Sequence, residues 1–326
     1  MKAVVCKAWG PPESLVIEDR PALEATPGTV VMSVKAANVK FSDTLIIQNK
    51  YQTKPKLPFI PGSEVAGVLK AIGAGVEGWK VGDRVAAQAG DGGYAEEVMV
   101  ETDRLLAIPD TIDFASAAGL ASTYGTSYYA LTDRGQLRAG ETLLVLGASG
   151  GVGMAAVEIG KALGARVIAC ASSEEKLAVC RAHGADETIN YVTEDMRARV
   201  KAITNGNGVD VIYDPVGGEY SELALRDMAW GGRFLVIGFA AGDIPKIPLN
   251  LPLIKCCSIV GVWMGAFAKR DRAQQRANAV EIWKWFAQGK IKPHVWATYP
   301  LGKAADALNA LAARKVAGKV VLTTEA

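Results

Sequence analysis

The sequence predicts an α/β protein in which a doubly wound parallel sheet is joined to a mostly β domain. Residues 123–265 alternate strand-like and helix-like apolar runs, which is typical of a parallel sheet covered by helices. Residues 1–122 instead carry short strand-like runs separated by Gly, Pro and Asp, as in a folded-over sheet or a partly open barrel. A glycine cluster lies between an apolar strand and a helix near residue 150, where a dinucleotide-binding turn is expected.

Length and composition limit the possible functions. The 326 residues suffice for two domains with separate cores. Lys and Arg number 36 against 34 Asp and Glu, so the net charge of +2 favours neither nucleic acid nor an anionic membrane as a partner. No apolar run reaches the roughly 20 residues that span a bilayer. Five cysteines, an odd number, and no export signal favour reduced thiols and a cytoplasmic protein.

The first region is expected to be mostly strand. Its candidate strands are Lys2–Ala8, Leu15–Asp19, Thr29–Ala37, Glu64–Ile72, Arg84–Ala87 and Ala95–Val100. Between them, Lys40–Gln48 is expected to form a short helix or turn, which Asp43 caps or where it pairs with a nearby cation.

The glycine cluster begins the second region. Leu143–Leu146 has strand length, Gly147 starts the turn, and Met154–Leu163 is helical. Ser149, Gly150, Gly151 and Val152 are therefore expected where backbone amides at a helix N-terminus bind a pyrophosphate, although by spacing alone an ordinary strand-to-helix turn is the alternative.

Four further strands and a final edge strand follow. A capping box of Ser172 with Glu175 predicts a helix that ends near His183. The strands are Ala165–Ala171, Glu187–Asn190, Val209–Asp214, Arg233–Phe239 and Cys257–Trp263. The tail adds a helix that ends before Gly289, an alanine-rich helix over Ala304–Ala313 and the run Gly318–Leu322.

Metal ligands are scarce. The cysteines have no C-x-x-C spacing, and the only histidines are His183 and His294. A structural zinc site is therefore not expected.

Three motifs in the first region carry a family resemblance. Pro61–Val68 leads to Gly73, Val81–Val85 and Gly92–Glu96, in the order and spacing of the medium-chain dehydrogenase/reductase superfamily. The chain is similar in particular to its zinc-independent quinone oxidoreductase branch, the zeta-crystallin-like proteins. The resemblance implies a discontinuous GroES-like catalytic domain, 1–122 with 266–326, and a Rossmann NADPH-binding domain, 123–265.

The zinc enzymes of that superfamily differ at two positions. Where they carry the histidine of Gly-His-Glu, this chain has Ser63, and near their cysteine ligand it has Lys40. Neither side chain is a plausible zinc ligand, so we expect no catalytic metal.

The second strand predicts NADPH over NADH. NAD-binding domains place a carboxylate at its tip, whereas this chain has Ser172 and Ser173. The resemblance assigns the 2′-phosphate to Lys176 and to Tyr191; a solvated surface lysine is the alternative for Lys176. Further expected cofactor contacts are Thr126, Gly238, Phe239, Ala240, Val262, Trp263 and Arg314, the last being equally a solvated arginine.

Without a metal, hydride transfer to an electrophilic acceptor is easier to rationalise than alcohol oxidation. We expect the acceptor to be a quinone or another conjugated carbonyl. Lys40 replaces an asparagine usual in the branch and is interpreted as stabilising an enolate, attracting an acidic substrate or pointing to solvent. Tyr51 is the second catalytic candidate, with packing at a domain edge as its alternative.

Other functions fit the same motifs. A 2-alkenal or enoyl-thioester reductase differs only in pocket side chains, and a non-catalytic NADPH-binding protein, crystallin-like or RNA-binding, belongs to another class. The branch is usually dimeric, so a homodimer paired through the edge strand near Ser258–Trp263 is expected.

Overall fold

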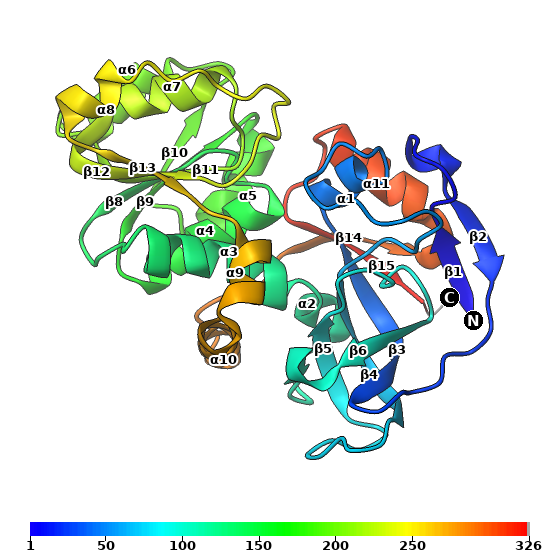
Figure 1. Cartoon of the computed structure of the whole chain (residues 1–326). Helices are drawn as coiled ribbons and strands as arrows, with labels where there is room; N and C mark the ends of the chain where they lie inside the picture. The colour runs from blue at the N-terminus through cyan, green and yellow to red at the C-terminus, as the bar shows by residue number, and fades with distance from the viewer. Residues whose placement is uncertain (325–326) are drawn as a thin grey trace. The chain divides into compact units, whose positions relative to one another are not determined.

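The structure, a computed structural model, describes residues 1–324 and divides into two compact units. Unit 1 contains Met1–Ser122 and the chain from Pro293 onward, and unit 2 contains Thr123–Lys292 (Figure 1).

Unit 2 is built on a six-stranded parallel sheet in the order β10-β9-β8-β11-β12-β13. Numbered from its first strand, this is the order 3-2-1-4-5-6 of a dinucleotide-binding sheet, so the predicted doubly wound fold is confirmed. The strands are β8 (Thr142–Val145), β9 (Arg166–Ala171), β10 (Glu187–Asn190), β11 (Val209–Asp214), β12 (Met228–Val236) and β13 (Ser258–Gly261).

The helices of unit 2 follow the strands in alternation. Helix α4 (Gly151–Ala162) packs closely on the sheet because a Cβ at Gly160 would lie 2.7 Å from the Leu143 side chain. The others are α3 (Gly125–Tyr129), α5 (Glu174–Ala182), α6 (Met196–Ile203), α7 (Glu219–Arg226), α8 (Asn250–Lys255), α9 (Met264–Arg270) and α10 (Arg272–Ala287). Apolar residues of β8, β9 and β11 are fully buried, as expected for strands covered on both faces.

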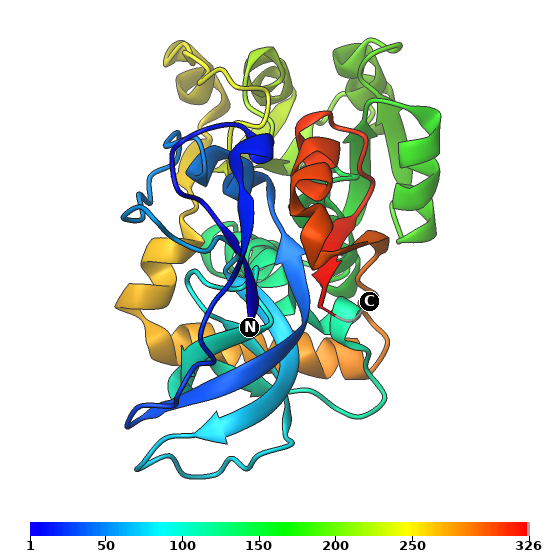
Figure 2. The ribbon, with the colours of Figure 1, turned by 90° about the vertical axis from the view of Figure 1, so that its right-hand side faces the viewer.

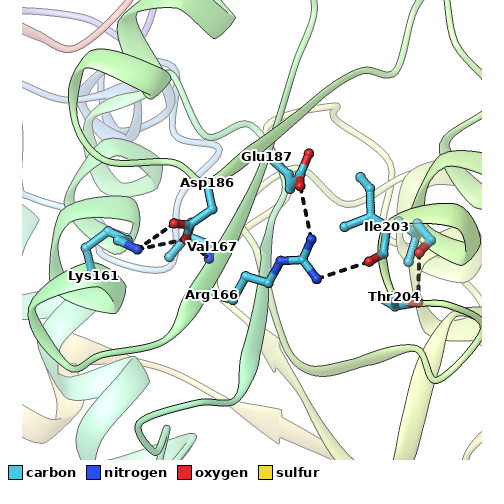
Figure 3. A network of polar contacts seen from close by, with 8 residues as sticks. Lys161, Arg166, Val167, Asp186, Glu187, Ile203 and Thr204 are labelled. Atoms are coloured by element: carbon cyan, nitrogen blue, oxygen red, sulfur yellow. Dashed lines mark hydrogen bonds and ion pairs between the residues drawn. The ribbon is translucent and has the colours of Figure 1, made fainter.

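Ion pairs tie together the amino ends of the strands. Arg166 donates to Glu187 at 3.0 Å and to the Ile203 carbonyl at 3.0 Å (Figure 3). Lys161 binds Asp186 at 2.7 Å, and that carboxylate also accepts the Val167 N–H (Figure 3). These contacts fix the end of the sheet opposite to the glycine turn.

The second domain boundary lies later than the sequence predicted. Residues 266–292 were expected in the discontinuous domain, but they belong to unit 2. The reason is the packing of α10, whose Asn278 donates to Asp133 at 2.7 Å and whose Trp285 meets the ring of Tyr128 at 5.4 Å.

Unit 1 is mostly strand, as predicted. Its main sheet has the order β14-β15-β3-β4-β5-β7, β6 also pairs with β3, and β1 pairs with β2. The tail strand β15 joins β3 in antiparallel register, so the chain returns to complete its first unit (Figure 2). The strands are β1 (Lys2–Val5), β2 (Val16–Asp19), β3 (Thr29–Val39), β4 (Glu64–Ile72), β5 (Arg84–Gln88), β6 (Glu97–Glu101), β7 (Leu105–Ala107), β14 (Val295–Pro300) and β15 (Lys319–Thr323).

Three short helices complete unit 1: α1 (Phe41–Ile46), α2 (Phe114–Ala117) and α11 (Ala304–Ala312). One core cluster joins the strands of unit 1 to α11 through Ala304, Ala307 and Leu308. In the described part of the chain, no helix is both long and apolar enough to cross a bilayer.

Candidate active site

The glycine turn has the geometry that its sequence predicts. A Cβ at Gly153 would lie 2.3 Å from the Gly147 carbonyl oxygen, and Gly147 itself has φ +57°. Glycine at both places lets the start of α4 approach the end of β8. Gly150 is the N-cap of α4, so the first amides of a 12-residue helix remain available beside the buried Ser149. These glycines thus permit the close packing of α4 on β8, and pyrophosphate binding at the turn stays a prediction.

The loops after β11 and β12 lie beside this turn. Ala240 donates to the Pro215 carbonyl at 3.0 Å and Ala241 to that of Val216 at 2.8 Å, while Val216 lies against Gly147. The predicted contacts Gly238, Phe239 and Ala240 are therefore at the carboxyl end of the sheet, with Gly147–Gly153.

Asp214 shapes this end of the sheet, a role that sequence reasoning missed. Its buried carboxylate accepts hydrogen bonds from Val216 N at 2.8 Å, Gly217 N at 2.9 Å and the Ser221 hydroxyl at 2.5 Å. Burial nevertheless raises the pKa of Asp214, because those bonds only partly offset desolvation. The Asp-Pro-x-Gly-Gly sequence after β11 was the available signal.

The expected 2′-phosphate residues gather at the end of β9. Lys176 Nζ lies 3.3 Å from Ser172 Oγ, and the Tyr191 N–H donates to the carbonyl of Ala171 at 3.3 Å. The helix cap differs from the prediction: Ser173, not Ser172, is the N-cap of α5 and accepts the Lys176 N–H at 3.4 Å. Ser172 directly follows the strand instead, and its hydroxyl contacts Lys176.

The remaining predicted cofactor residues of unit 2 lie on α3 and after β13. Thr126 is in α3, Val262 donates to the Val236 carbonyl at 3.1 Å, and Trp263 is 58% exposed. Next to Thr126, Ser127 Oγ donates to the Val152 carbonyl and lies 2.8 Å from the Tyr213 hydroxyl. This buried contact, unseen in the sequence, fixes α3 against the first turn of α4.

In unit 1 the structure joins the two positions that replace zinc ligands. Lys40 follows β3 directly as the N-cap of α1, and Ser63 precedes β4, the strand paired with β3. Lys40 Nζ donates to Ser63 Oγ at 2.5 Å. Three roles were considered for Lys40 from the sequence. In the structure its ammonium binds a side chain of the protein and does not simply point to solvent.

A buried tyrosine braces both residues. Tyr94 donates its hydroxyl to Asp43 Oδ2 at 2.8 Å, and the same oxygen accepts the backbone N–H of Lys40 at 2.9 Å. The Tyr94 ring lies against Gly62, where a Cβ would come within 2.3 Å of it. Asp43 thus caps α1 as predicted.

The Asp43 carboxyl interacts electrostatically with both Lys40 and Glu64. Burial raises the pKa of Asp43, although Lys40 and the two hydrogen bonds act to lower it, and nearby Glu64 raises it further. Glu64 is itself buried and accepts bonds from Asn38 Nδ2 at 2.8 Å and Ser122 N at 2.5 Å. The Lys40 charge therefore has one carboxyl group, that of Asp43, within electrostatic reach.

The other two predicted site residues stand apart from these contacts. Tyr51 lies half-buried in the loop after α1, and within residues 1–324 its hydroxyl has no hydrogen-bond partner. Arg314 follows α11 in unit 1 with φ +55°, whereas Lys176 and Tyr191 belong to unit 2. The proposed roles of Tyr51 and Arg314 remain predictions.

Comparison with known proteins gives the family. Residues 26–110 match the family described as alcohol dehydrogenase GroES-like domain, and residues 151–281 match that described as zinc-binding dehydrogenase. The chain is 39% identical to a quinone oxidoreductase-like protein 2 homolog of Nematostella vectensis, over 99% of this chain and 89% of that protein.

Solved structures agree with this match. The Escherichia coli quinone oxidoreductase complexed with NADPH is 29% identical, with a TM-score of 0.91 over 99% of this chain and 100% of the other. A structure described as an NAD-dependent alcohol dehydrogenase is 33% identical, with a TM-score of 0.93 over 100% of both chains. The chain belongs to the zinc-independent quinone oxidoreductase branch of the medium-chain dehydrogenase/reductase superfamily.

Proposed function

We propose that the chain is an NADPH-dependent reductase that needs no metal and transfers hydride to a quinone or another conjugated carbonyl. The observation that supports this most is the end of β9, where Lys176 contacts Ser172 and no carboxylate lies at the strand tip. A 2′-phosphate bound there would contact the Lys176 ammonium and the hydroxyls of Ser172 and Ser173. The strand tip lacks the carboxylate that would select NADH.

The residues present fit the dinucleotide. Ser149, Gly150, Gly151 and Val152 would hold the pyrophosphate, Ser172, Ser173, Lys176 and Tyr191 the 2′-phosphate, and Gly238–Ala240 with Thr126, Val262 and Trp263 the remainder. When bound, NADPH supplies the hydride. The task left to the protein is to hold the acceptor and to accommodate charge that develops on its oxygen.

Unit 1 supplies the groups for that oxygen. Lys40 and Ser63 stand where zinc relatives place ligands, and a lysine ammonium and a hydroxyl are hydrogen-bond donors rather than zinc ligands. Within residues 1–324, no three His, Cys, Asp or Glu side chains are grouped to hold a metal ion. Lys40 would therefore stabilise the enolate or hydroquinone oxyanion, and Tyr51 would line the acceptor site.

Within the same proposal the protein is a cytoplasmic homodimer. The edge strand β13 and its flanks expose apolar side chains, Leu249, Leu253, Ile254, Ile259 and Trp263, in one short segment of unit 2. An open apolar edge favours pairing with a second copy.

The test is cofactor consumption with NADPH and with NADH against 1,4-benzoquinone, 9,10-phenanthrenequinone, a 2-alkenal and an enoyl-CoA. We expect turnover with quinones and a kcat/KM for NADPH at least about 10-fold above that for NADH. Preference for the alkenal or thioester would reassign the protein to double-bond reduction. Tight NADPH binding without turnover on any acceptor would make it a binding protein.

A further inference from the structure

Lys40 and Ser63 form more than a charged patch. Ser63 Oγ accepts a hydrogen bond from Lys40 Nζ at 2.5 Å, so the hydrogen of the Ser63 hydroxyl is available to a different acceptor. Within the described residues, that hydroxyl has no acceptor in the protein. The pair therefore presents an O–H whose oxygen is polarised by an ammonium.

The pair is also rigidly placed. Tyr94 fixes Lys40 through Asp43 and fixes the turn before Ser63 through Gly62, and the Ser63 carbonyl accepts Ala89 N–H at 2.8 Å. Residues that transfer protons must be held in position, because small displacements cost large factors in rate.

The charges around Lys40 favour a neutral ligand. Asp43 interacts electrostatically with Lys40, and Glu64 lies close enough to act on Asp43, so an acidic substrate would add to the negative charge of these two carboxyl groups. When a neutral carbonyl oxygen accepts a proton from the site and Lys40 is then reprotonated, the net charge of the site is unchanged.

We infer that Lys40 and Ser63 form a proton relay that lets this protein reduce isolated aldehydes and ketones to alcohols, in addition to conjugated acceptors. This inference rests on the proposed function, since the same bound NADPH supplies the hydride. An isolated carbonyl yields an alkoxide, which is far more basic than a hydroquinone anion and therefore requires a proton donor at the oxygen.

The step balances as follows. The carbonyl carbon receives the hydride, and the C=O π pair moves to oxygen. That oxygen takes the proton of Ser63 Oγ, Ser63 Oγ takes one from Lys40 Nζ, and the Lys40 amine regains a proton from water. Carbonyl, NADPH and one proton thus give alcohol and NADP⁺.

The experiment compares hexanal, which has no carbon–carbon double bond to reduce, with 1,4-benzoquinone, and identifies hexanol as product. In Lys40→Asn, kcat/KM for hexanal should fall at least about 100-fold, while that for the quinone falls by less than about 10-fold. Lys40→Arg keeps the charge but cannot release a proton, so it should lose hexanal reduction as severely as Lys40→Asn. In Ser63→Ala, kcat/KM for hexanal should fall about 10-fold or more. Lys50→Asn changes an exposed lysine after α1 and should leave kcat/KM unchanged for both acceptors.

A second readout does not depend on activity. Limited acetylation with acetic anhydride, quantified by mass spectrometry, should modify Lys40 several-fold faster in Ser63→Ala than in the wild type, because Ser63 Oγ no longer engages the nitrogen. Lys50 provides the internal reference.

The outcomes separate this inference from the proposed function. Quinone turnover without hexanol from the wild type overturns the relay and leaves the quinone reductase proposal standing. Equal losses on both acceptors in Lys40→Asn, or full hexanal activity in Lys40→Arg, also overturn it. No turnover on any acceptor rejects both.

Discussion

The hydroxyl of Tyr124 donates a 2.7 Å hydrogen bond to Oε2 of Glu158, a carboxylate buried on α4. Oε2 also accepts the backbone N–H of Lys292 at 3.1 Å, and Oε1 lies 2.5 Å from His183 Nδ1. Tyr124 and Lys292 lie near the two points where the chain passes between its units. One carboxylate therefore anchors both of these chain segments to helix α4.

Glu158→Gln should destabilise the protein. An amide offers one acceptor and brings two N–H donors into a site built for an acceptor, so we expect a loss of about 1–3 kcal/mol in the free energy of unfolding. Urea denaturation followed by circular dichroism measures it. Glu219→Gln, at an exposed glutamate in unit 2, should change stability by less than about 1 kcal/mol. Equal effects of the two substitutions would contradict the anchoring role.

Lys176→Ala should weaken NADPH binding selectively. Loss of a charge-assisted hydrogen bond to the 2′-phosphate is worth about 1.5–3 kcal/mol, or about 10–100-fold in affinity for NADPH, with little change for NADH. Calorimetry with 2′,5′-ADP measures the contact without catalysis. Lys201→Ala, on the exposed face of α6, is the control. A parallel loss of NADH affinity would show that Lys176 supports the fold instead.

Local patterns allowed much of this fold to be predicted. The strand, glycine turn and helix at 143–163 follow from the apolar periodicity and from the close approach of Gly153 to Gly147. Both features depend only on residues that are near one another in the sequence. The strands Glu187–Asn190 and Val209–Asp214 were predicted with the ends that the structure shows.

Contacts between distant residues were not predictable in the same way. Lys40 and Ser63 are 23 residues apart and meet only because β3 pairs with β4. The Tyr124–Glu158 bond spans 34 residues, and the late domain boundary depends on the packing of α10 against α3. Periodicity reports which face of an element is apolar, but not which polar partner that face will meet.

The cysteines should differ sharply in reactivity. Cys256 is exposed, whereas Cys6, Cys170 and Cys180 are buried, and burial raises the pKa of Cys180 to about 12. Since the thiolate is the nucleophile, 5,5′-dithiobis(2-nitrobenzoate) at pH 8 should titrate Cys256 rapidly and the three buried thiols only after unfolding. Cys256→Ser should abolish the rapid phase. Its persistence in that variant would assign it to another thiol.

Substitution at the edge of the unit 2 sheet should break the proposed dimer. Ile259 in β13 is 41% exposed, and a lysine there would place like charges opposite each other across a two-fold axis. Multi-angle light scattering should give twice the mass of one chain for the wild type and a single-chain mass for Ile259→Lys. Ile17→Lys, at an exposed isoleucine of β2, should stay dimeric. A wild-type monomer would reject the proposed assembly.

Glu141 should make stability depend on pH. Its carboxylate accepts two hydrogen bonds from Arg233, at 2.6 and 3.0 Å, and one from Arg138 N–H at 2.9 Å. Burial acts to raise its pKa, but these bonds outweigh burial, so the pKa of Glu141 lies below its usual value in the folded state.

The sign follows from the protons bound in each state. Above the unfolded value of about 4.3 both states are ionised and the full stabilisation is present, and it is lost as the pH falls through the lower folded-state pKa. Glu141→Gln should therefore cost about 1–3 kcal/mol at pH 7 and progressively less below pH 4, as measured by urea denaturation at each pH. In Glu222→Gln, which breaks an exposed i,i+4 pair with Arg226, the loss should stay below about 0.5 kcal/mol. A Glu141→Gln deficit that is constant from pH 7 to pH 3 would show that the glutamine disturbs packing instead of removing a charge.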